Sequence, residues 1–157
     1  FAISSAISGS VGGGAKEGKR LKAEFDKNIP SFKSLKNELS QAYKRGYLKG
    51  LDGRKLFIRS EHKCLSQLLQ SAGALLCKKW LALVDQEIKA QNLENDALVL
   101  AWVHDELQIA CRTSEVAHNV GDILKRMAEE AGDHFGISRK LPIEADYAVG
   151  RTWCETH

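Results

Sequence analysis

No hydrophobic run in this sequence approaches the roughly 20 apolar residues that a helix needs to cross a bilayer. The four cysteines lie far apart, and none belongs to a C-x-x-C pair. This spacing argues against zinc binding and against a disulfide framework. We therefore expect reduced thiols in a cytoplasmic protein, with Cys77 and Cys111 as small core residues. The opening residues have no basic segment before their apolar part, and no P-loop pattern follows the glycine-rich stretch 4–14, so neither a secretory signal nor a P-loop is predicted.

The rest of the composition is ordinary for a globular protein. With 157 residues, of which 43% are hydrophobic and 27% charged, the chain is long enough for one domain with a buried core. It begins with Phe1 rather than methionine, so we expect it to be a piece of a longer protein.

The charge is unevenly distributed along the chain. Residues 16–63 hold 14 Lys and Arg against 6 Asp and Glu, whereas residues 94–157 hold 6 against 12. A basic half beside an acidic half fits an enzyme that grips a polyanion with one surface and collects cations with the other. The alternative, a pair of solvated lysine-rich helices, stays open on charge alone.

Two helices and a hairpin are predicted in the basic half. Apolar side chains recur at helical spacing on both sides of Asn28-Ile29-Pro30, and we expect Ser31 to cap the second helix. Asp52-Gly53, flanked by alternating apolar residues within 47–59, predicts a β-hairpin. This turn is either purely structural or brings the basic residues that follow it to a phosphate backbone.

The longest periodic segment is 61–92, where apolar residues follow a 3.6-residue spacing. We expect much of this helix to be buried, with Gly73 allowing close backbone packing. His62, Ser66 and Gln70 form a polar stripe at i, i+4 and i+8. By itself this stripe is typical of a boundary between core and solvent.

The chain is organised around residues 97–112. Two short apolar runs flank His104, Asp105 and Glu106, which predicts a second hairpin with a charged turn. Carboxylate oxygens suit magnesium or manganese, so the turn is a candidate cation site. Successive strand residues point to opposite faces, so we expect Asp105 to be the direct ligand and Glu106 a weaker, water-mediated one.

An amphipathic helix is predicted over 114–135, capped by Thr113 and followed by a strand in which Ile143, Ala145, Tyr147 and Val149 alternate with polar residues. The acidic end of this helix, Glu129, Glu130 and Asp133, is expected to be solvated. The fold class is α+β: a small antiparallel sheet made of the 97–112 hairpin and the C-terminal strand, backed by long helices, with a helical segment at the N-terminus.

A series of motifs supplies the functional context. AKEGKRLK, LDGRK, LLQSAGALLCK, WVHDELQIACR and an ending with Gly150, Trp153 and His157 follow one another in this order. The series resembles the family A (DNA polymerase I-like) DNA polymerases, most closely their bacteriophage branch. WVHDELQIACR resembles their motif C. The resemblance implies that residues 1–46 are the C-terminal part of the fingers region and residues 47–157 a part of the palm.

The resemblance also implies roles for single residues. Asp105, with Glu106, would hold catalytic magnesium, two ions in the complete enzyme, for which manganese can substitute. His104 would lie toward the primer terminus, and Gln70 would donate to minor-groove acceptors that every base pair presents. His62 matches only the phage branch, and Ser66 stands where the family usually has asparagine. Contact with backbone phosphates is expected of at least one of Arg54, Lys55 and Arg59.

The family's motif A aspartate and motif B finger helix are absent from these 157 residues. We therefore expect the chain alone to be nearly inactive, with primer-template DNA, dNTP and the missing N-terminal part of the polymerase as partners. The expected location is the cytoplasm of an infected or lysogenic bacterial host. The alternatives are a non-catalytic DNA-binding fragment and, more weakly, a small metal-dependent nuclease using Asp105 and Glu106.

Overall fold

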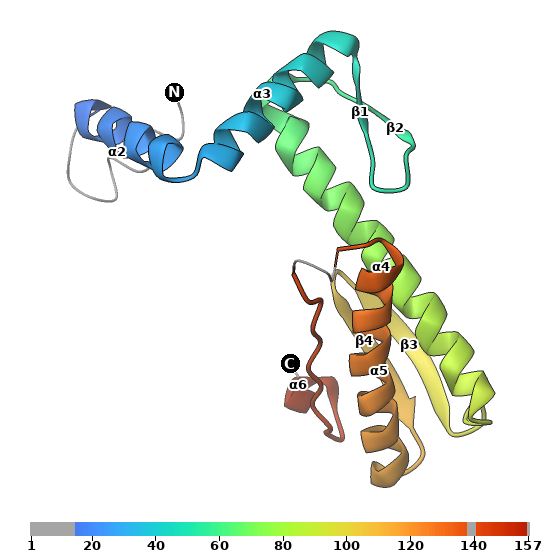
Figure 1. Ribbon diagram of the computed structural model, residues 1–157. Helices are drawn as coiled ribbons and strands as arrows, with labels where there is room; N and C mark the ends of the chain where they lie inside the picture. Colours follow the sequence, from blue (N-terminus) through green and yellow to red (C-terminus); the bar gives the residue numbers. More distant parts are fainter. Residues whose placement is uncertain (1–14, 138–140, 157) are drawn as a thin grey trace. The chain divides into compact units, whose positions relative to one another are not determined.

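The computed structural model describes residues 15–137 and 141–156 (Figure 1). Their elements, in chain order, are α2 (Ala15–Asn28), α3 (Pro30–Arg45), β1 (Tyr47–Lys49), β2 (Lys55–Phe57), the 3₁₀ turn η1 (Glu61–Lys63), α4 (Cys64–Ala90), β3 (Ala97–Val103), β4 (Glu106–Cys111), α5 (Ser114–His134) and α6 (Trp153–Thr156). The mixed fold of helices and small antiparallel sheets is confirmed. No helix of the described residues is long and apolar enough to cross a membrane.

The described residues form two compact units. One contains the residues up to Leu48 together with Lys55–Gln67, and the other contains Lys49–Arg54 together with the residues from Leu68 onward. This grouping follows local packing and does not coincide with the sequence boundary between 46 and 47. The assignment of fingers and palm stays a prediction.

The first unit contains the predicted break between two helices. α2 ends at Asn28 and α3 begins at Pro30, since proline fits the first turn of a helix. The prediction of Ser31 as N-cap was wrong: Ile29 occupies that position without a side-chain cap. A T-shaped contact of Phe25 with Phe32, at 5.4 Å between ring centroids, joins the two helices instead.

Both predicted hairpins are present. β1 pairs with β2, and the Gly53 amide, in the left-handed region at φ 82°, donates to Gly50 O at 2.9 Å to close the turn. β3 pairs with β4 in antiparallel register from Ala97–Cys111 to Val103–Glu106. This second hairpin packs in the second unit.

The core of the second unit lies between α4, the β3–β4 hairpin and α5. Val84 of α4 and Ile123 of α5 are fully buried, and Ala97, Leu107 and Val120 belong to the same cluster. Trp80 Nε1 donates to Leu124 O at 2.9 Å and ties α4 to α5. The predicted inward face of α5 is confirmed, as is Thr113, whose hydroxyl accepts from Val116 N at 3.2 Å.

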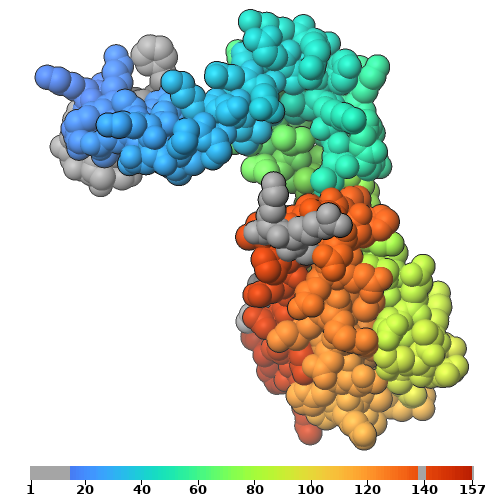
Figure 2. Space-filling view, in the orientation of Figure 1, coloured from blue at the N-terminus to red at the C-terminus, as the bar shows by residue number. Residues whose placement is uncertain are grey.

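The predicted C-terminal strand is not a strand. Residues 142–150 make no sheet ladder, and each of the two described sheets has two strands. The segment is nevertheless extended, with alternating exposure from Ile143 to Tyr147, and it lies along α5 (red beside orange in Figure 2). The alternation therefore reflects packing against a helix, with no neighbouring strand to bond to.

Gly121 makes this packing possible. A Cβ placed there would lie 2.4 Å from the ring of Tyr147, so the ring rests directly on the helix backbone. Lys125 Nζ donates to Asp146 Oδ1 at 3.1 Å, which raises the pKa of Lys125. The extended segment is thus attached to α5 by side chains on two consecutive residues.

The expected burial of α4 holds along its C-terminal half and fails in its middle. Leu83, Val84 and Ile88 are buried, but Leu69 is 61% exposed. A Cβ at Gly73 would meet no described atom within 4 Å, so this glycine supports no close packing here. At these two positions the helix is therefore not packed as its periodicity predicted.

These two helical glycines give opposite predictions for stability. We expect Gly121→Ala to lower the free energy of unfolding by roughly 1–3 kcal/mol, because the new methyl group collides with the Tyr147 ring. Gly73→Ala, the matched control, should raise it by roughly 0.5–1 kcal/mol, because alanine favours helix and meets nothing. Urea unfolding of the two variants measures both values, and equal effects would contradict the packing of Tyr147 on α5.

Candidate functional site

The two-residue turn of the β3–β4 hairpin carries the charged tip. Val103 and Glu106 form the last pair of the ladder, so His104 and Asp105 occupy the loop positions. His104 has a φ of 56°, as the first position of a tight hairpin turn requires and as few side chains adopt. Trp102 Nε1 donates to His104 O at 2.6 Å and stabilises this backbone conformation.

Asp105 is exposed and takes part in none of the ion pairs formed by described residues. Its neighbour on α4 is Cys77: burial raises the pKa of that thiol, and the Asp105 carboxylate raises it further. Cys77 lies seven residues after Gln70, which puts both on nearly the same face of α4. The aspartate therefore lies beside the helical face that carries Gln70.

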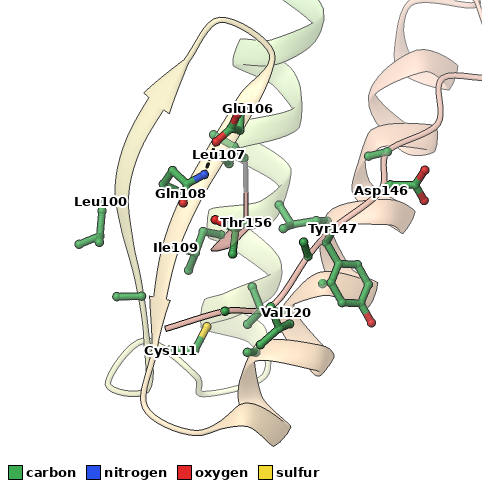
Figure 3. Close-up of a pocket in the computed structure, with 18 of the residues that line it drawn as sticks. Leu100, Glu106, Leu107, Gln108, Ile109, Cys111, Val120, Asp146, Tyr147 and Thr156 are labelled. Carbon is green, nitrogen blue, oxygen red and sulfur yellow. Dashed lines mark hydrogen bonds between the residues drawn. The ribbon is translucent and has the colours of Figure 1, made fainter. Parts of the chain in front are cut away.

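Glu106, the first residue of β4, is half-buried and held by side chains. Gln108 Nε2 and Trp153 Nε1 both donate to its Oε1, the latter at 3.1 Å. Figure 3 shows the bond from Gln108 along the strand. The two carboxylates thus differ: Asp105 is open to solvent, whereas Glu106 is oriented by neighbours from β4 and α6.

Asp105 and Glu106 have the oxygen ligands that magnesium prefers, but two carboxylates are too few to complete its coordination. Magnesium prefers hard oxygen ligands at near-octahedral geometry and keeps several waters. No group of three or more His, Cys, Asp or Glu among the described residues could hold a metal. A magnesium ion held by these two carboxylates would need further ligands from substrate, water or another part of the polypeptide.

A groove of about 1520 Å³ begins at the charged tip. Residues of α4 and α5 line it together with β4 and the extended segment, and Asp105 and Glu106 lie among its lining residues. Figure 3 shows β4 on one side, the extended segment on the other, and Thr156 of α6 between them. Side chains of Leu107, Ile109 and Val120 make part of its lining apolar.

The predicted polar stripe on α4 is shorter than expected. The helix begins at Cys64, so His62 lies in η1 and does not continue the helical spacing of Ser66 and Gln70. All three side chains are exposed. Exposure leaves them accessible to a ligand, and their contact with DNA stays a prediction.

The three basic residues near the first hairpin have different surroundings. Arg54 forms an ion pair with Asp52 within the turn, and this pair lowers the pKa of Asp52 against the effect of burial. Lys55 Nζ lies 4.8 Å from the centroid of the Tyr47 ring, whereas Arg59 is exposed and forms no ion pair within the described chain. Of the three, Lys55 and Arg59 form no ion pair with a described carboxylate.

Sequence reasoning missed the side chains that orient the tip. Trp102 and Gln108 lie next to the turn in sequence, and their bonds to it follow from a hairpin's side-chain directions only once its register is known. Trp153 lies 47 residues from Glu106, and no local signal pairs the two. The one indication in the sequence that Trp153 has a role was its place in the C-terminal motif.

The pKa of Cys77 reports on the position of Asp105. We expect Asp105→Asn to speed alkylation of Cys77 by iodoacetamide at mildly alkaline pH, because removing the carboxylate lowers the pKa of the thiol and increases the thiolate fraction. Cys111 is the internal control, since burial alone raises its pKa. Mass spectrometry of the labelled peptides gives both rates, and an unchanged Cys77 rate would place Asp105 away from α4.

Comparisons with known proteins agree with this architecture. The model of DNA polymerase family A matches residues 3–155. Over 94% of its length the chain is 36% identical to the DNA-directed DNA polymerases of Enterobacteria phage T3 and Escherichia phage T7, and it spans 23% of theirs. It is 26% identical to DNA polymerase I of Bacillus subtilis (strain 168) over 85% of its length and 14% of that protein.

Solved structures that resemble the fold of this chain include a polymerase domain. It is the POL domain of Pol1 from M. smegmatis in complex with DNA primer-template and dNTP, with a TM-score of 0.70 at 20% sequence identity. The match covers 82% of this chain and 24% of that one. The family match over nearly the whole chain and the identity to the phage proteins establish that the chain belongs to DNA polymerase family A.

Proposed function

We propose that this chain is the C-terminal part of a template-directed DNA polymerase that acts in phage DNA replication, joining dNTP to a primer 3′-hydroxyl. The observation that carries the proposal is Asp105, an exposed carboxylate on a two-residue turn, in a chain of family A. The phage relatives, which the chain matches over 94% of its length, are named DNA-directed DNA polymerases. The site of action is the host cytoplasm.

In this proposal Asp105 is the direct magnesium ligand and Glu106 acts through water. When bound, two magnesium ions supply activation of the 3′-hydroxyl and stabilisation of the departing pyrophosphate, with manganese as a substitute. The transition state spreads charge over phosphoryl oxygens, so positioning and electrostatics contribute most of the rate. The task of this chain is therefore to hold carboxylates at a defined place on a rigid hairpin.

The remaining predicted residues serve the DNA. His104, held in its turn by Trp102, contacts the terminal primer nucleotide. Gln70, on the α4 face beside Asp105, donates to minor-groove acceptors, which purine N3 and pyrimidine O2 present on every pair. Ser66 and His62 continue this contact, and at least one of Arg54, Lys55 and Arg59 binds a backbone phosphate.

The chain alone lacks part of this machinery. Two carboxylates do not complete a magnesium site, and the chain spans 23% of the phage relatives. The missing N-terminal part of the polymerase supplies the motif A aspartate and the nucleotide-binding finger helix. The groove beside β4 is a suitable place for it to dock, because it starts at Asp105 and runs along a strand edge that no described strand pairs with.

Primer extension tests the proposal. When this chain is produced together with the coding region upstream of it, we expect magnesium-dependent, template-directed extension that Asp105→Asn lowers roughly 1,000-fold, the scale expected when a charge that stabilises the transition state is removed. Asp96→Asn is the matched control: Asp96 pairs with Arg112 at 3.2 Å, near the base of the hairpin, and its loss should leave extension intact. Full activity of the Asp105 variant would refute the proposal.

The basic residues near the first hairpin predict how DNA affinity responds to salt. Reversing Lys55 or Arg59 to glutamate should weaken binding equally for all sequences and reduce the slope of log K against log salt by about 0.9 for each phosphate that is no longer neutralised. Arg54 is a poorer probe, because it is already paired with Asp52. Lys89→Glu serves as the control, since Lys89 pairs with Asp85 at 2.8 Å on α4.

Fluorescence anisotropy of labelled duplexes at several salt concentrations measures this slope. A slope unchanged in both Lys55→Glu and Arg59→Glu would remove these residues from the DNA interface. DNA binding without any extension by the combined polypeptides would instead favour the non-catalytic, DNA-binding alternative.

A further inference from the structure

The C-terminal turn of the chain reaches back to the charged tip. Trp153 Nε1 donates to Glu106 Oε1 at 3.1 Å across 47 residues of sequence. The same oxygen accepts from Gln108 Nε2, which comes from β4 itself. One oxygen of the carboxylate therefore receives donors from two separate elements.

Two donors on one oxygen define the direction of the other oxygen. A carboxylate offers about four lone-pair positions on its two oxygens, and these two donors take positions on Oε1. Gln108, next but one on the same strand, moves together with Glu106. Trp153 comes from a different element, so it fixes the carboxylate relative to the body of the unit.

The turn that carries Trp153 is held in shape by its own hydrogen bonds. The Arg151 amide donates to Glu155 Oε2 at 2.7 Å, and Thr156 Oγ1 donates to Trp153 O at 3.1 Å. Gly150 lets the chain close tightly, since a Cβ there would lie 2.6 Å from Glu155 Cβ. The indole thus projects from a defined turn although it is 50% exposed.

Side chains just ahead of this turn anchor it to α5. Tyr147 packs on Gly121, and Asp146 accepts from Lys125, three and four residues before Gly150. A continuous set of contacts therefore runs from α5 through the extended segment and Trp153 to Glu106. The hairpin tip is attached to the helix by this path as well as by the core beneath the strands.

We infer that Trp153 is a positioning residue for the Glu106 carboxylate, and that the C-terminal turn thereby sets the geometry of the acidic tip. The inference rests on the proposed function, because orienting Glu106 matters to a site that gathers cations. Removing the indole N–H takes away the donor that comes from α6 and leaves the one from Gln108, so the carboxylate is less well oriented and its contribution to holding magnesium falls.

The contact itself is tested without metal, by the indole N–H resonances of the 157-residue chain. The chain has three tryptophans, and Trp153→Phe identifies the resonance of Trp153. We expect Glu106→Ala to move that resonance upfield, because the bond to the carboxylate is removed, and to leave that of Trp80, bonded to Leu124 O, in place. Glu94→Ala, an exposed carboxylate ahead of β3, is the control and should move neither. A Trp153 resonance that ignores Glu106→Ala overturns the inference.

The functional consequence is tested by magnesium titration of primer extension in the combined polypeptides. We expect Trp153→Phe to raise the half-saturating magnesium concentration by about tenfold, the usual scale for a residue that orients a metal ligand. The KM for dNTP and the Kd for DNA should stay unchanged. Trp80→Phe removes an indole bond of the same kind from the core and should leave the magnesium dependence unaltered.

A double variant separates positioning from a general loss of structure. In a Glu106→Ala background Trp153→Phe should cause no further change, because the group it orients is gone. An additive effect, or equal effects of Trp153→Phe and Trp80→Phe, overturns the inference. If Trp153→Phe has normal magnesium dependence while Asp105→Asn is inactive, only this inference is overturned. If Asp105→Asn is active, the proposed function is overturned.

Discussion

The structure depends on the burial of one face of the β3–β4 hairpin against α4 and α5. Leu107 and Ala97 from the strands meet Val84 and Ile123 from the helices in a single cluster. A two-stranded hairpin is marginal in water by itself, and the helices supply the apolar surface that keeps it ordered. Because this core holds the strands, the two-residue turn at their end has a defined position while its side chains face outward.

The three residues of the tip differ in how strongly their surroundings constrain them. His104 adopts a left-handed backbone, which costs about 1–2 kcal/mol for a residue with a Cβ, and the bond from Trp102 offsets part of that cost. Glu106 is oriented by side chains from β4 and α6. Asp105 has neither constraint, and it is the residue whose carboxylate is most accessible to a ligand. Rigid neighbours around one open carboxylate are what a site needs if positioning is its main contribution.

The same unit has apolar surfaces that its described residues leave exposed. The groove beside β4 is partly apolar, α4 exposes Leu69, and β3 exposes Leu98 and Leu100. The chain spans 23% of its phage relatives, and in the proposed function the rest of the polymerase meets it across surfaces of this kind. In the proposed function, the N-terminal part of the polymerase would account both for the incomplete carboxylate set and for the exposed groove.

The sequence by itself determined the local elements. Periodicity, Pro30, Asp52-Gly53 and Thr113 act within a few residues of themselves, so the helices, both hairpins and a helix cap could be predicted from them. Only the tertiary structure decided what each face meets. Residues 142–150 pair with no described strand and pack on α5, Leu69 and Gly73 of α4 stay unpacked, and Trp153 bonds to Glu106 across 47 residues. Such contacts depend on where the core brings distant segments together, and the spacing of residues along the chain does not encode which distant segments meet.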